Sequence, residues 1–192
     1  MFESRRVRSS LFYRLVPVFA VSAAVLFFMT FFWGPMARAI EVDIGHVPPV
    51  EVYFSPHNGT TAAIVREIDR ARSEIQVQAY SFTSAPIAQA LLHAFKRGIK
   101  VEVILDKSQK TGKYSSSTFL MNARIPTYID SEHAIAHNKI ILIDRTVVIT
   151  GSFNFTKAAE EKNAENLLII RSRELVKPYL DNWQHHRNHS SI

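Results

Sequence analysis

Residues 137–154 read HNKIILIDRTVVITGSFN and hold two short apolar runs separated by the polar residues 144–146. Each run is about as long as an average strand, and the segment between the runs is short enough for a hairpin. The runs therefore predict two antiparallel strands, over Lys139–Ile143 and Val147–Thr150.

Four polar residues flank this hairpin: His137 and Lys139 at its start, and Ser152 and Asn154 at its end. Side chains alternate along a strand, so the members of each pair are expected to project to the same side. Together they suit a phosphate diester, because an ammonium and an amide hold its non-bridging oxygens while an imidazole attacks phosphorus or moves a proton. This chemistry requires no metal, and we expect no cofactor.

From residue 50 onward the chain consists of strand-like and helix-like segments. The predicted strands are Val50–Phe54, Glu74–Tyr80, Ile99–Leu105, Ile125–Ile129, Lys139–Ile143, Val147–Thr150 and Asn166–Ile170; the predicted helices are Thr60–Ser73, Pro86–Arg97 and Glu174–His189. Strands and helices alternate in the first half, whereas a hairpin dominates the second. This order predicts an α/β fold: a single layered domain with a mixed β-sheet flanked by helices.

The N-terminal residues 1–39 have the composition of a targeting signal or a membrane anchor. Arginines precede an uncharged apolar run over 15–33, and an A-x-A sequence ends at Ala39. This order is typical of a cleaved signal peptide, although the run exceeds the roughly 7–15 residues of a signal core and approaches the roughly 20 that span a bilayer. We expect an exported protein, periplasmic or secreted, or alternatively one anchored to the inner membrane and facing the periplasm. Residues 40–49 are the expected linker and 50–192 the catalytic domain.

The charge balance changes along the chain. The whole chain has 23 Lys and Arg against 17 Asp and Glu, but residues 40–192 hold 18 and 16, so the expected mature part is only mildly basic. Attraction to nucleic acid must then come from local clusters of charge. The chain has no cysteine, which excludes disulfides, zinc–thiolate sites and thiol nucleophiles.

The spacing H-x-K-x4-D from His137 to Asp144, followed by G-S-x-N from Gly151 to Asn154, resembles the signature of the phospholipase D superfamily. The small bacterial endonuclease branch is similar over further segments: Val52–Pro56, Ala79–Thr83, Leu105–Ser108 and Gly151–Thr156. The resemblance begins near residue 50 and covers the catalytic domain, less clearly in its last helix. It implies a phospholipase D-like fold and a metal-independent phosphodiesterase.

The resemblance also implies a role for each site residue. His137 corresponds to a nucleophile that forms a phosphohistidine intermediate, and Lys139 and Asn154 to the groups that bind the phosphate oxygens. Ser152 would assist in the same pocket. Glu165 corresponds to the carboxylate that hydrogen-bonds the histidine, which suits a nucleophilic imidazole because one nitrogen must be free and the other held by an acceptor.

Some polar residues have two interpretations at the level of sequence. Asp144 belongs to the motif, but it is equally suited to the hairpin turn, where it would orient the strands without touching phosphate. Lys107, Lys110 and Lys113 lie in a polar loop after a predicted strand; they are either solvated charges or contacts to a substrate backbone. We therefore include Lys107 and Lys110 as candidate substrate-binding residues.

The remaining histidines near the C-terminus receive structural interpretations. His185 and His189 lie four residues apart on the last helix, with His186 beside them, a spacing that can bind zinc. No carboxylate or cysteine motif accompanies them, so we expect a solvated, partly frayed helix end. His133 is expected to be a loop residue.

The chain contains one H-x-K motif, whereas members of the resembled superfamily use two. Short members pair two copies, so we predict a homodimer with the active site across a two-fold axis, each subunit contributing one His137. The expected function is cleavage of DNA, with RNA also open, without sequence specificity. The alternative is a phospholipase D-type hydrolase of membrane phospholipid headgroups, because lipids of this kind are phosphodiesters too.

Overall fold

The computed structural model describes residues 45–46, 48–110 and 115–192. The expected signal peptide or anchor over 1–39 lies outside the described residues, as does Lys113. Within the described part of the chain, no helix combines the length and the apolar character needed to cross a membrane.

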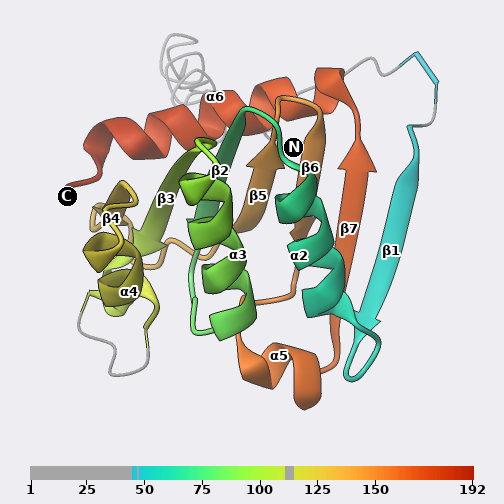
Figure 1. Ribbon diagram of the computed structural model, residues 1–192, viewed down its shortest axis with the longest axis horizontal. Coiled ribbons are helices and arrows are strands. Elements are labelled where there is room, and N and C mark those ends of the chain that lie inside the picture. Colours follow the sequence, from blue (N-terminus) through green and yellow to red (C-terminus); the bar gives the residue numbers. More distant parts are fainter. Residues whose placement is uncertain (1–44, 47, 111–114) are drawn as a thin grey trace, which may run out of the picture. The chain divides into compact units, whose positions relative to one another are not determined.

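The described strands form one mixed seven-stranded sheet with the order β1-β7-β6-β5-β2-β3-β4 (Figure 1). The strands are β1 Val50–Ser55, β2 Glu74–Ala79, β3 Lys100–Asp106, β4 Thr127–Asp130, β5 Lys139–Ile143, β6 Val147–Gly151 and β7 Glu165–Arg171. β2, β3 and β4 pair in parallel, whereas β2–β5, β5–β6, β6–β7 and β7–β1 are antiparallel. The predicted mixed sheet is confirmed, with parallel pairing in part and an antiparallel β5–β6 hairpin.

Helices cover both faces of the sheet (Figure 1). They are α2 Thr60–Arg70, α3 Ala85–Lys96, α4 Ser117–Asn122, α5 Lys157–Glu161 and α6 Arg173–His189, with a 3-10 turn, η1, at Lys107–Gln109. α2 and α3 pack on one face over Ile75, Val77 and Ile141. α6 packs on the opposite face, where Trp183 contacts the side of the sheet that carries Leu142. The expected layered α/β domain is thereby confirmed.

The β5–β6 hairpin is tighter than the sequence indicated. The amide of Thr146 donates to the carbonyl of Ile143 at 3.0 Å, so only Asp144 and Arg145 form the loop. Both have left-handed backbone, with φ of 52° and 54°, as a type I′ turn requires. The predicted helix 60–73 ends earlier, at Arg70, because the chain then turns to offer backbone amides to Asp144.

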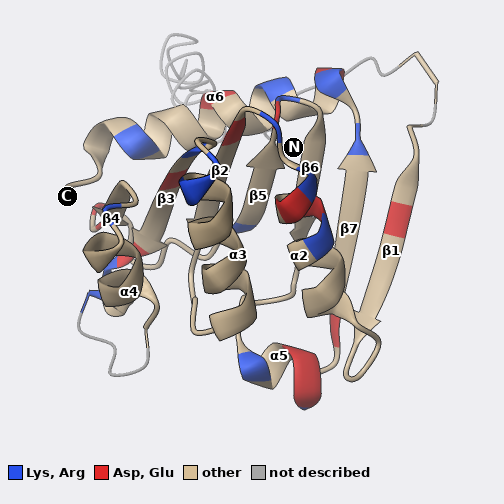
Figure 2. Cartoon of the chain, in the orientation of Figure 1, with Lys and Arg blue, Asp and Glu red and all other residues tan. Residues whose placement is uncertain are grey.

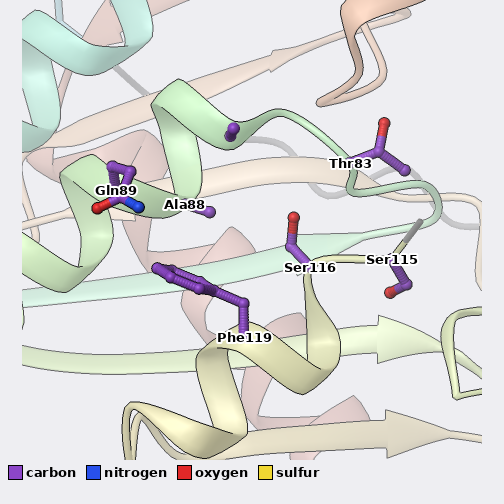
Figure 3. A pocket seen from close by; sticks show the side chains of 7 residues that line it. Thr83, Ala88, Gln89, Ser115, Ser116 and Phe119 are labelled. Atoms are coloured by element: carbon purple, nitrogen blue, oxygen red, sulfur yellow. The ribbon is translucent and has the colours of Figure 1, made fainter. Parts of the chain in front are cut away.

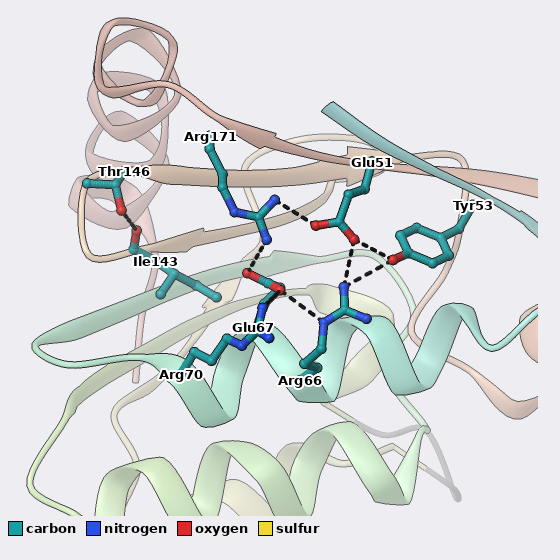
Figure 4. A network of polar contacts seen from close by, with 8 residues as sticks. All are labelled: Glu51, Tyr53, Arg66, Glu67, Arg70, Ile143, Thr146 and Arg171. Atoms are coloured by element: carbon teal, nitrogen blue, oxygen red, sulfur yellow. Dashed lines mark hydrogen bonds and ion pairs between the residues drawn. The ribbon is translucent and has the colours of Figure 1, made fainter. Parts of the chain in front are cut away.

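An ionic network around the buried carboxylate of Glu67 fixes the β1 edge of the sheet (Figure 4). Glu67 on α2 is only 4% exposed, and its carboxylate accepts hydrogen bonds from Arg66, Arg70 and Arg171. Glu51 on β1 contacts Arg66 and Arg171, each at 2.7 Å. Because three guanidinium groups compensate the buried carboxylate, the network joins α2 to both β1 and β7 without leaving an unpaired charge.

Candidate functional site

The predicted site residues lie at one end of the strands. This row of strand ends is called the site edge of the sheet. In the antiparallel β5–β6–β7 unit, the start of β5, the end of β6 and the start of β7 fall at the same edge, next to α5 (Figure 1). His137 and Lys139 are at the start of β5, Asn154 follows β6, and Glu165 opens β7. The fold therefore gathers residues that are up to 28 positions apart in the sequence (137 and 165).

Lys139 is an unusually enclosed cation. Its side chain is 6% exposed, and its ammonium donates to the carbonyl of His137 at 2.9 Å and lies 5.3 Å from the ring centre of Tyr80. Burial lowers the pKa of Lys139, and the nearby carboxylate of Glu165 opposes this shift. An ammonium held in this way is positioned to bind a phosphate oxygen with little reorganisation.

His137 is exposed on a segment that is fixed on both sides. Its ring centre lies 4.6 Å from that of Tyr80, which places the imidazole and the Lys139 ammonium against the same aromatic ring. The next carbonyl, of Asn138, accepts a hydrogen bond from the amide of Tyr80 at 2.8 Å. Ordered backbone on one side and an accessible ring on the other suit a nucleophile.

Two residues that support this segment were not assigned a role from the sequence: Tyr80 and Asp106. Asp106 ends β3, is 3% exposed, and accepts the amide of Ala136, beside His137, at 2.8 Å. Burial alone would raise the pKa of Asp106, but hydrogen bonds from Ser108 and Ala136 outweigh it and hold the pKa below the ordinary value. The only sequence signal was an acidic residue closing an apolar strand.

Ser152 and Gly151 join the site loop to β7. The Ser152 hydroxyl accepts the backbone amide of Asn166 at 3.0 Å, and the Ser152 amide donates to the Asn166 carbonyl at 3.1 Å. A Cβ on Gly151 would lie 2.3 Å from the same carbonyl oxygen, so only glycine fits there. Ser152 is exposed at this edge, and its hydroxyl oxygen accepts the bond that holds β7 in register.

Asn154 retains unused hydrogen-bonding capacity. Its amide oxygen is buried and has no hydrogen-bond partner among the described residues. The neighbouring Phe153 and Phe155 are both fully buried, which confirms the expectation that alternation turns them into the core. Asn154 thus points to the other side, where an unpaired amide is costly unless a ligand or water completes it.

Glu165 contacts a different neighbour from the one that the resemblance implies. Its carboxylate accepts the side-chain amide of Asn163 at 3.1 Å and lies close enough to Lys139 to raise that residue's pKa. No hydrogen bond joins Glu165 to His137 within the part of the chain that the structure describes. The structure therefore brings Glu165 to the ammonium of the site.

Asp144 lies apart from the other motif residues, at the opposite end of β5. Its carboxylate accepts hydrogen bonds from the amides of Arg72, Ser73 and Glu74, at 2.8–3.1 Å, and from the Ser73 hydroxyl at 2.8 Å. These bonds overcome the effect of burial, which would raise its pKa, and hold the pKa below the ordinary aspartate value. The residue locks the hairpin turn to the start of β2.

Asp144→Ala is expected to destabilise the fold by about 2–3 kcal/mol, through lost hydrogen bonds and a less tolerated left-handed backbone. The lowered pKa means that the carboxylate stabilises the fold above the ordinary aspartate value of about 4 and loses this effect as the pH falls through the folded value. Urea unfolding of wild type and variant should therefore converge under acidic conditions. Asp181→Ala, which removes an exposed aspartate of α6, is the control, and a kcat far below wild type in folded Asp144→Ala would contradict the structural role.

The candidate substrate-binding lysines lie at the end of β3, on the same edge as the site. Lys107 is exposed and donates to the carbonyl of His133 at 2.8 Å, and Lys110 follows η1, also exposed. Elsewhere, basic and acidic residues are interspersed, as on α2 and α6 (Figure 2). The described domain therefore has two exposed positive groups on the edge that carries the site.

A pocket of about 230 Å³ lies between α3 and α4, near this edge (Figure 3). Thr83, Gln89, Ser116 and Phe119 are among its lining residues. The amide of Thr83 donates to the carbonyl of Phe155 at 2.9 Å, so the pocket adjoins the loop that carries Asn154. None of the predicted catalytic side chains lines it, so it is a neighbour of the site.

Within the described residues, one group of side chains has the composition of a metal site, and it does not include His137. It consists of Asp130, His133, His186 and His189. The expectation of a solvated, frayed helix end is wrong for His186 and His189, because α6 extends through His189 and His186 is only 9% exposed. The sequence alone did not reveal the carboxylate partner, which comes from β4.

Comparison with known proteins places the fold and the motif in one family. Residues 64–187 match the sequence family described as the phospholipase D-like domain of cardiolipin synthase. A phospholipase D of Rickettsia felis is 49% identical over 134 residues, covering 70% of this chain and 67% of the relative. A mitochondrial cardiolipin hydrolase of Mus musculus is 30% identical over 130 residues, covering 67% of this chain and 59% of that protein.

The solved structures agree. The phospholipase D family member Nuc from Salmonella typhimurium superposes with a TM-score of 0.72 at 39% identity, covering 75% of this chain and 97% of Nuc. The resemblance seen in the H-x-K and G-S-x-N motifs is thus confirmed by sequence and by fold. The chain belongs to the phospholipase D superfamily of phosphodiester hydrolases.

Proposed function

We propose that this protein is a metal-independent phosphodiesterase that hydrolyses DNA, and RNA as a related diester, without sequence specificity. The observation that carries the proposal is the pairing of His137 and Lys139 against one face of the site: an exposed imidazole and an enclosed ammonium share the Tyr80 ring. Asn154 adds a side-chain amide, whose N–H groups can donate to a phosphate oxygen. A nucleophile beside two phosphate-binding groups is the minimum that diester cleavage needs.

The reaction proceeds in two displacements at phosphorus. A ring nitrogen of His137 attacks, the bond from phosphorus to the leaving oxygen breaks, and that oxygen takes a proton from a general acid. Water then attacks the phosphohistidine, the P–N bond breaks, and the same group accepts the proton from water. Lys139 and Asn154 hold the non-bridging oxygens throughout, where negative charge develops.

The general acid is supplied by a second copy of the chain in this proposal. The described residues contain one H-x-K motif, and His137 is exposed, so it is accessible to a two-fold-related subunit. His137 of the partner subunit then protonates the leaving oxygen. Because a residue near a two-fold axis meets its own copy, one surface per subunit completes the site.

Backbone contacts explain why DNA cleavage would be independent of sequence. Lys107 and Lys110 are exposed at the edge of the sheet that carries the site, where their ammonium groups would meet backbone phosphates of a bound strand. Contacts to phosphates position a nucleic acid without reading its bases.

The arginines before the apolar run 15–33 support export of this domain from the cytoplasm.

The second candidate is a hydrolase of phospholipid headgroups. Two relatives named phospholipase D and mitochondrial cardiolipin hydrolase favour it, and Ile135, two residues before His137, is 58% exposed. Against it, Phe153 and Phe155 are fully buried and give the site no apolar rim. DNA is therefore the preferred substrate.

Cleavage should be measured with the purified full chain in excess EDTA, in parallel on plasmid DNA and on vesicles that contain cardiolipin. The proposal predicts DNA cutting that persists in EDTA and is lost in His137→Ala. Lipid hydrolysis with intact DNA would establish the second candidate instead. DNA cutting that EDTA abolishes while the protein stays folded would exclude the metal-independent mechanism.

A further inference from the structure

We propose that Asp130, His133, His186 and His189 form a zinc site, separate from the catalytic edge residues, that joins the last turn of α6 to the end of β4. One ligand atom from each residue lies within 4.8 Å of all the others. In the sheet order, β4 is three strands from β5, which at a strand spacing of about 4.8 Å is roughly 14 Å from the start of the catalytic strand.

The distances suit zinc closely. Nδ1 of His186, Nδ1 of His133 and Nε2 of His189 lie 2.7, 3.2 and 3.4 Å from one carboxylate oxygen of Asp130. Bonds of roughly 2.0–2.2 Å to zinc place neighbouring tetrahedral ligands about 3.3 Å apart. Small side-chain shifts would therefore bring three imidazole nitrogens and one carboxylate oxygen around the ion.

Hydrogen bonding alone leaves this group poorly satisfied. Three imidazoles face one carboxylate that is fully buried, and Nε2 of His189 is buried without a hydrogen-bond partner. If the rings of His133, His186 and His189 were all protonated, their positive charges would repel, since the ring centres are only 4.8–5.3 Å apart. One divalent cation would accept a lone pair from each ring and would also neutralise the carboxylate.

The surroundings also orient the ligands. Nδ1 of His189 faces the carboxylate of Glu132 at 3.5 Å, which favours a proton on Nδ1 and leaves Nε2 for the metal. The second oxygen of Asp130 accepts the amide of Glu132 at 3.1 Å.

Four protein ligands leave no open position, which is typical of a structural zinc site. The ion would tie together three segments: β4, the loop that leads towards His137, and α6. The backbone already joins β4 to the C-terminus through hydrogen bonds between Ile129 and Ser191, at 2.7 and 3.1 Å. Zinc would therefore stabilise the folded chain without entering the reaction.

Zinc binding should be measured on the full chain after chelator treatment and gel filtration, by titration against a chromophoric competitor. The expected result is one Zn²⁺ per chain, and Co²⁺ in its place should give the visible absorption of a tetrahedral site. His133→Ala and His189→Gln should each weaken zinc binding by more than about 100-fold, beyond the 10–100-fold cost of losing an outer partner. His185→Ala is the matched control, since His185 is exposed on the same helix turn but outside the four-residue group.

Thermal unfolding provides a second measurement that needs no substrate. Zinc should raise Tm in wild type and His185→Ala but not in folded His133→Ala or His189→Gln. Absence of zinc binding, unchanged binding in both ligand variants, or equal loss in His185→Ala would overturn the four-ligand site. Because the readouts are binding and stability, they are independent of whether the protein cleaves DNA or lipid.

Discussion

His137→Ala is expected to lower turnover on the order of 10⁴-fold or more while leaving the fold intact, because removal of a nucleophile eliminates the covalent route entirely. His137 is exposed, precedes β5 and makes no hydrogen bond through its ring to the described residues, so truncation leaves no cavity in the core. Initial rates on plasmid DNA, together with circular dichroism and Tm, measure the two parts of the prediction.

His93→Ala is the matched control, because His93 is an exposed histidine on α3, remote from the site edge. It should retain wild-type turnover. A folded His137→Ala protein with appreciable residual activity would remove His137 from the role of nucleophile.

The same variant tests whether two subunits share the site. If one site needs both copies of His137, a dimer with one mutant subunit is inactive, and activity falls as the square of the wild-type fraction after subunits are mixed and exchanged. Independent monomer sites would instead give a linear fall. An affinity tag on the mutant subunit alone, which recovers untagged wild-type subunits after exchange, shows that heterodimers have formed, and a linear relation in their presence would exclude the shared site.

Lys139→Ala is expected to reduce kcat by roughly 10²–10³-fold, the usual effect of removing one group that stabilises charge in the transition state. Lys139 is 6% exposed and its ammonium is already oriented by the His137 carbonyl, so water cannot replace it in the same geometry. Steady-state rates on DNA measure the loss. Lys157→Ala, which removes an exposed lysine of α5, should have no comparable effect.

The pH profile gives an independent check on Lys139. Burial lowers its pKa, so the ammonium should lose its proton, and activity should decline, at a lower pH than an exposed lysine would require. Because Glu165 opposes this shift, Glu165→Gln should move the alkaline limb to still lower pH. An alkaline limb unchanged in Glu165→Gln would contradict electrostatic coupling between the two residues.

Local patterns were enough to predict the strands and the motif residues they carry. β5 has the predicted bounds, because an apolar run bounded by polar residues is a property of neighbouring positions. The short helices α4 and α5 were missed, because they are only six and five residues long and neither is long enough for a full apolar stripe. Helix α2 was predicted too long because its end depends on distant Asp144.

By itself, the sequence determined the mixed α/β sheet, the hairpin and the four polar residues at its ends, since alternation and spacing are local. Only the tertiary structure decided which partner each charge meets. It placed Asp144 against residues 72–74, at the opposite end of β5, and Glu165 beside Lys139. It also brought Asp130 to histidines 56 and 59 residues later in the chain. Such contacts depend on the packing of α6 and on the order of strands in the sheet, and that order brings together residues that no local pattern connects.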